Sequence, residues 1–169
     1  MLWIMKPIDK AGIAQSINFI QSLTAEEKIE YCENIRELQP YAFLSVVALL
    51  QEDVSVSNVD HGMNLLMVIH HAFYSHCRSL PLITVDMLRD ALDGNAAMMQ
   101  SIGRGWLSHD RSVAIYPEKI MLTVIICYIK VNNLGSPCKE NERLITRIKM
   151  VLDAYGKAKH VAANSIWLH

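Results

Sequence analysis

Long apolar runs, glycine, proline and signatures of catalysis are all scarce in this sequence. Its longest apolar stretches, 41–50 and 120–129, have about ten residues, against the ~20 that a membrane-spanning helix needs. Seven glycines and five prolines are too few for a collagen-like or low-complexity polymer. The amino-terminal stretch lacks the basic region and the small-residue cleavage site of a secretory signal peptide. We therefore expect a cytoplasmic protein with no membrane span.

Metal and redox motifs are also missing. The four cysteines are far apart, and no two of them form a Cys-x-x-Cys pair: Cys32, Cys77, Cys127 and Cys138. Isolated thiols of this kind are typical of a reducing compartment. Four of the seven histidines lie within 61–76, but none belongs to a His-Glu-x-x-His motif and no two are four residues apart. The sequence therefore predicts neither a metal nor a cofactor.

What the sequence does contain is enough apolar material for one core. Hydrophobic residues make up 51% of the chain and charged residues 20%, with a net charge of -1. A chain of this length buries about two-thirds of its unfolded surface without help from metals or disulfides. The apolar residues recur at helical spacing nearly throughout, and no sustained alternation suggests a strand. We expect a single all-α domain over 1–169, a bundle of six to seven helices.

Helix boundaries follow from capping residues and prolines. Thr24 with Glu27 forms a capping box, in which the side chain of each residue accepts the backbone N–H of the other, and Ser57 and Thr84 are further candidate caps. The predicted helices cover about 9–22, 24–39, 40–51, 57–79, 84–102, 116–132 and 139–155. Because 40–51 is apolar on all sides, we expect it at the centre with 57–79 and 116–132. Helices 24–39 and 139–155 should form the charged flanks.

The strongest surface feature is an acidic stripe on the predicted helix 24–39. Its four members are spaced so that they fall within about a 60° arc of one helix face: Glu26, Glu30, Glu33 and Glu37. One interpretation is a solvated helix face. The other is a docking surface for a basic partner protein, because a line of carboxylates steers association and rejects like-charged competitors. Small inhibitors of basic enzymes, such as immunity proteins that neutralise nucleases, use surfaces with the same physics.

Helix 139–155 carries the opposite stripe, Lys139, Arg143 and Arg147. These cations could face solvent, pair with the acidic helix of the same molecule, or meet phosphates. The pI of about 6.6 is far from the basic footprint of a nucleic-acid-binding domain, and no recognition motif accompanies the stripe. Nucleic-acid binding is therefore the weakest of the three functions considered.

A polar line runs along the otherwise apolar helix 57–79: Asp60, Asn64, His71, Ser75 and Arg78. A buried polar group without a partner destabilises the fold by about 1 to 3 kcal/mol, so this line should reach solvent, a hydrogen-bonded network or a groove. A groove there would suit a small-molecule-binding protein or an enzyme.

The longest predicted connection, 103–115, contains Arg104, Trp106 and Arg111. Tryptophan and arginine are enriched at binding hot spots, although a tryptophan in a loop also serves as an anchor on the core. Ser108, His109 and Asp110 are adjacent in sequence, whereas a catalytic relay needs side chains that converge from separate places. We assign no catalytic residue.

Together these features favour a protein-interaction module, an inhibitor, immunity or adaptor protein that acts by occupying a partner's surface. The expected contacts are the four glutamates and the loop residues Arg104, Trp106 and Arg111. The alternatives are a small-molecule binder with a polar groove and, third, a nucleic-acid binder.

Overall fold

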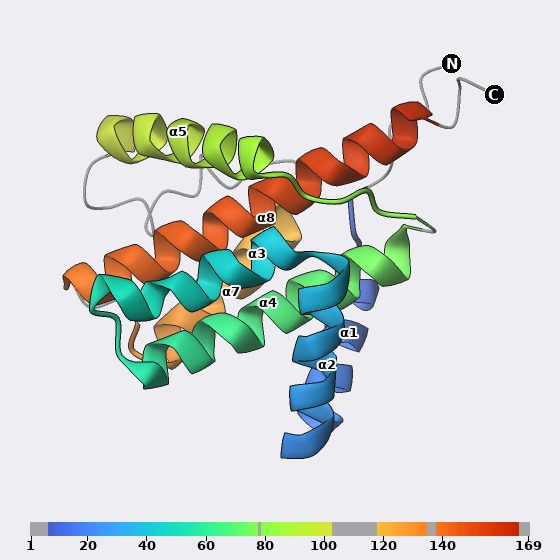
Figure 1. Cartoon of the computed structure of the whole chain (residues 1–169), viewed down its shortest axis with the longest axis horizontal. Coiled ribbons are helices and arrows are strands. Elements are labelled where there is room, and N and C mark those ends of the chain that lie inside the picture. The colour runs from blue at the N-terminus through green and yellow to red at the C-terminus, as the bar shows by residue number, and fades with distance from the viewer. Residues whose placement is uncertain (1–6, 78, 103–117, 135–137, 166–169) are drawn as a thin grey trace.

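The computed structural model describes residues 7–77, 79–102, 118–134 and 138–165 of the chain. Within these ranges the protein is all-α, as the periodicity predicts, and its helices pack on one another in one body (Figure 1). Its elements are α1 (Lys10–Ser22), α2 (Ala25–Leu38), α3 (Pro40–Val47), the 3-10 helix η1 (Ala48–Glu52), α4 (Val56–His76), α5 (Val85–Ile102), α7 (Lys119–Val131) and α8 (Lys139–Ser165).

Local side-chain caps fix where several helices begin. The predicted capping box is present at α2, where the Thr24 hydroxyl accepts the Glu27 amide and the Glu27 carboxylate accepts the Thr24 amide. Thr84 accepts the amide of Met87 at the start of α5, also as predicted. The prediction for α4 is wrong by two residues, because Ser55 and not Ser57 caps it through the amide of Asn58.

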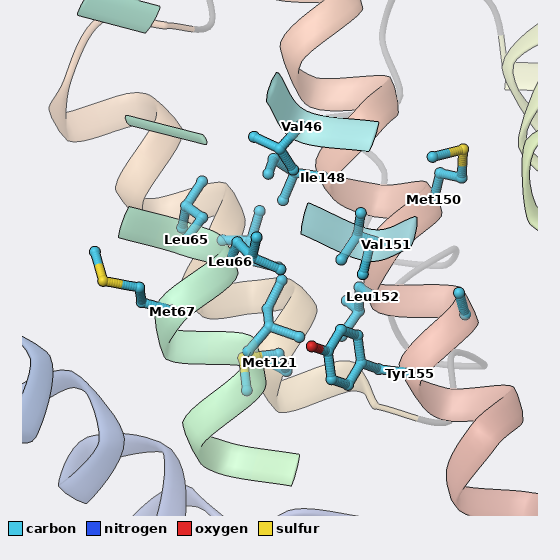
Figure 2. Close-up of a cluster of buried hydrophobic side chains, with 14 of the residues drawn as sticks. Val46, Leu65, Leu66, Met67, Met121, Ile148, Met150, Val151, Leu152 and Tyr155 are labelled. Atoms are coloured by element: carbon cyan, nitrogen blue, oxygen red, sulfur yellow. The ribbon is translucent and has the colours of Figure 1, made fainter. Parts of the chain in front are cut away.

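The core is built around α4 and α8. α4 packs against both α1 and α8, and α5 packs along the other side of α8. Figure 2 shows side chains of four helices meeting between α4 and α8: Val46, Leu65, Leu66, Met121, Ile148, Val151, Leu152 and Tyr155. The long helix α8 is therefore central and not a charged flank, and it continues ten residues beyond the predicted end at Tyr155, to Ser165.

The segment 40–51 is less central than its composition predicts. It forms α3 followed by η1, and it buries Ala42, Val46 and Leu49, while Tyr41 and Leu44 stay exposed. An all-round apolar helix is expected to be enclosed, but this one is covered on one side only. The exposed side is one of several apolar surfaces outside the core.

Gln39, which ends α2, anchors the connection between α4 and α5. Its fully buried amide accepts the backbone N–H of Ile83 at 2.7 Å through Oε1, and donates through Nε2 to the Tyr74 hydroxyl at 3.0 Å and the Pro81 carbonyl at 3.1 Å. This one side chain therefore sets the path along which the chain enters α5.

Among the described helices, none combines the length and the apolar character that crossing a bilayer requires.

Candidate functional site

The four glutamates of α2 lie together on its solvent face. All four are exposed, and they occupy the side of the helix opposite Ile35, which is fully buried. Figure 1 shows α2 with α1 at the edge of the molecule, away from α5. On the same face Ile29 is 66% exposed, three residues after Glu26 and four before Glu33. The surface thus combines a row of carboxylates with an apolar side chain at its edge.

Little inside the molecule compensates this negative face, which we call the acidic face and define as Glu26, Ile29, Glu30, Glu33 and Glu37. Glu33 pairs with Arg36 at 2.6 Å, with both side chains about half exposed. The other three glutamates make no ion pair with the residues that the structure describes. The intramolecular pairing of the acidic and basic helices is likewise not found among the described residues.

The basic stripe of α8 instead faces η1 and α5. Lys139, Arg143 and Arg147 line one cavity of about 390 Å³, together with Glu52, Leu92, Glu142 and Thr146. Arg147 binds the Glu52 carboxylate and donates to the Ser45 carbonyl at 2.9 Å, and Arg143 donates to the backbone carbonyl of Glu52. The two arginines therefore fasten α8 to η1, which weakens the argument for a phosphate-binding surface.

The described members of the polar line of α4 line neither this cavity nor the one between α5 and α8. Nδ1 of His71 lies 2.9 Å from Oγ of Ser16 on α1 and 3.4 Å from Oγ of Ser75. Ser16 is fully buried, and its hydroxyl lies within hydrogen-bonding distance of both Nδ1 of His71 and the Gly12 carbonyl. The His71 ring also stacks on Phe19 at 4.3 Å. This arrangement holds α1 against α4.

Of the other members of that line, Asn64 and Asp60 make contacts within α4 or face solvent, and Arg78 is outside the described residues. Asn64 donates to the backbone carbonyl of Asp60 one turn earlier, and the Asp60 side chain is exposed. Arg78 and the loop residues Arg104, Trp106 and Arg111 lie outside the described residues, so their expected roles stay predictions.

A second cavity of about 390 Å³ lies between α5 and α8, where the sequence pointed to no site. Its walls are Asp90, Ala91 and Gly94 from α5, Asp153, Gly156, Lys157 and His160 from α8, and Glu118 just before α7. Ligand pockets in proteins typically measure about 300 to 1,000 Å³. The one hint in the sequence is Gly94, which falls inside the predicted helix 84–102.

Buried lysines lie behind two of the cavity's carboxylates. Lys159 is 1% exposed, and its Nζ lies 2.6 Å from Oε1 of Glu118, whose Oε2 accepts the backbone N–H of Ile8. Nζ of Lys149 lies 2.9 Å from Oδ2 of Asp153. Burial raises the pKa of the Asp153 carboxyl and lowers the pKa of the Lys149 ammonium, since both charged forms lose hydration there.

Next to this pair, Asn95 is buried on α5 and its Nδ2 makes no well-formed hydrogen bond. Its proximity and that of Lys157 oppose the rise in the pKa of Asp153 without cancelling it. The amide nitrogen of Asn95 is therefore incompletely satisfied, a condition that is costly in a protein interior.

No three metal-ligating side chains come together within the described ranges. Comparison of the chain with protein-family models, with curated proteins and with solved structures finds no match.

Proposed function

We propose that this protein is a cytosolic interaction module that acts by docking the acidic face of α2 on a basic surface of a partner protein. The observation that carries the proposal is the exposure of all four glutamates on the side of α2 opposite the buried Ile35. An inhibitor, immunity or adaptor protein that covers its partner's surface fits this geometry.

Two further features support docking over mere solvation. Like charges at i, i+4 destabilise a helix by a few tenths of a kcal/mol per pair, so the row of glutamates is unfavourable for the isolated fold. Ile29 adds an exposed apolar side chain beside the charged row, and binding hot spots combine such an apolar anchor with polar neighbours. Electrostatic attraction would then raise the association rate, and burial of Ile29 would slow dissociation.

The test is a pull-down from lysate of the native host, treated with nuclease and quantified by mass spectrometry. The bait is the wild-type chain, and the test variant is Glu30→Lys/Glu33→Lys. A matched control, Asp60→Lys/Asp93→Lys, makes the same change in net charge at exposed positions on α4 and α5. Circular dichroism verifies that all three proteins fold.

We expect one stoichiometric basic protein that the wild type and the control both retain and that the α2 variant loses. Its affinity should fall as salt rises, because exposed charges are screened over a Debye length of about 8 Å at physiological ionic strength. Equal capture by the α2 variant, or no specific partner for the wild type, would contradict the proposal.

A further inference from the structure

The cavity between α5 and α8 carries a separate inference, because it lies on the opposite side of the bundle from α2 (Figure 1). We propose that it binds a small organic cation, a molecule with an ammonium or amidinium group on an apolar or aromatic body. Nothing in this proposal depends on the acidic face.

The first argument is the unused space beside two glycines. A Cβ placed on Gly94 or on Gly156 would meet no atom within 4 Å, so neither glycine is needed for α5 to approach α8. Gly62 of α4 provides the contrast, because its Cβ would lie 3.0 Å from Leu144 and 3.1 Å from Val46. Glycine within a helix destabilises it by about 0.5 to 1 kcal/mol relative to alanine. Gly94 and Gly156 therefore destabilise their helices without allowing closer packing of the two helices, and the space beside them forms part of the cavity.

The second argument is the chemistry of the walls. Three carboxylates line the cavity, and ionised carboxylates only accept hydrogen bonds. Ion pairs with Lys159 and Lys149 hold Glu118 and Asp153 in place. The other polar wall residues are more exposed: Lys157 is half exposed with its Nζ 3.6 Å from Asp90, and His160 is exposed. The polar atoms that ion pairs fix in the wall are therefore acceptors, and they select a ligand that donates.

The third argument favours a positive charge over a neutral donor. Burial raises the pKa of Asp153, which pairs with Lys149 and lies near Asn95 and Lys157, because its ionised form loses hydration there. An ammonium in the cavity beside Asp153 and Asp90 would favour the ionised form further, which a neutral donor would not do. Ala91 and the two glycines provide an apolar wall for the rest of the molecule.

The probes are phenethylamine, tryptamine and benzamidine, each with a neutral counterpart of the same shape: 2-phenylethanol, tryptophol and benzamide. Each is titrated into the isotope-labelled full chain, and amide shifts are followed by NMR. We expect saturable shifts within 90–94 and 153–160 for at least one of the cations. Its neutral counterpart should bind at least about tenfold more weakly, because it lacks the charge.

Variants then test the site itself. Gly94→Leu and Gly156→Leu each fill the cavity from a different helix, so one remains informative if the other does not fold. Asp90→Asn removes the most exposed carboxylate, and Asp93→Asn is its matched control on the same helix, outside the cavity. We expect about a tenfold loss of affinity in the first three variants and none in the control.

Three results would overturn the proposal: no saturable binding by any of the three cations, equal binding of a cation and its neutral counterpart, or unchanged affinity in the folded leucine variants. Loss of the α2 partner alone would leave it standing, because the two surfaces are read by different experiments.

Discussion

Nζ of Lys159 lies 2.6 Å from Oε1 of Glu118, with both side chains almost completely buried, and the second carboxylate oxygen of Glu118 accepts the amide of Ile8. This pair joins three places that are far apart in sequence: the residues before α1, the start of α7 and the last third of α8. Lys159 also lies over the Phe73 ring at 5.9 Å. A charged pair in a core stabilises only when both members are present, because each alone would be an uncompensated buried charge.

Lys159→Met should therefore lower the free energy of unfolding by about 3 to 5 kcal/mol, since the Glu118 carboxylate loses its partner. Lys159→Met/Glu118→Gln should lose less than Lys159→Met alone, because the amide is neutral and still accepts from Ile8. Urea denaturation of the two single variants and the double variant measures this coupling. Additive losses would show that the two groups do not interact.

Gln39→Ala should destabilise the connection between α4 and α5 and lower the free energy of unfolding by about 3 kcal/mol. The change leaves the amide of Ile83 and the carbonyl of Pro81 unpaired beside the void that the shorter side chain creates. Each unpaired buried group lowers the free energy of unfolding by about 1 to 3 kcal/mol. Urea denaturation measures the total, and hydrogen exchange at Ile83 measures the local effect. Unchanged protection of that amide would mean that Gln39 does not hold the connection.

His70 should make the fold less stable in acid. It is buried against the Tyr155 hydroxyl and the Tyr74 ring, and burial lowers its pKa from 6.5 to about 4. Below pH 6.5 the unfolded chain takes up a proton that the folded chain refuses, so stability present at neutral pH is lost as the pH falls toward 4.

Between about pH 7.5 and about pH 4.5 this group should lower the free energy of unfolding by about 2 to 3 kcal/mol. His71, whose pKa is also lowered by burial, adds a change of the same sign. His70→Gln keeps a hydrogen-bonding group opposite Tyr155 and removes the titration. The difference in pH slope between wild type and variant, from urea denaturation, isolates His70, and identical slopes would contradict the prediction.

The sequence could predict features whose parts are neighbours along the chain. Thr24 and Glu27 are three residues apart, so their capping box depends on nothing else in the fold. The spacing of Glu26, Glu30, Glu33 and Glu37 places them on one face of any helix, and charge favours solvent for that face. The row of glutamates could therefore be identified as a candidate site from the sequence alone.

What depends on the packing of distant helices could not be predicted in the same way. The exposed Tyr41 and Leu44 of α3 look like core residues by composition, and only the arrangement of α4 and α8 decides which apolar surface is covered. Gly156 is a residue type that often follows a helix end, yet α8 runs through it. The α5–α8 cavity draws Asp90, Glu118 and Asp153 from three separate segments, so no local pattern marks it.

Replacing glycine by alanine should change the free energy of unfolding in opposite directions at Gly156 and at Gly62. Gly156→Ala adds a methyl group in open space within α8, so the gain in helix propensity should raise the free energy of unfolding by about 0.5 to 1 kcal/mol. Gly62→Ala gains the same propensity, but its new methyl group meets Leu144 and Val46 at 3.0 and 3.1 Å. Overpacking a core costs about 1 to 3 kcal/mol, which outweighs the gain. Thermal and urea denaturation should therefore rank the proteins as Gly156→Ala, wild type, Gly62→Ala, and a Gly156→Ala variant less stable than wild type would show that the α5–α8 cavity does not extend to this position.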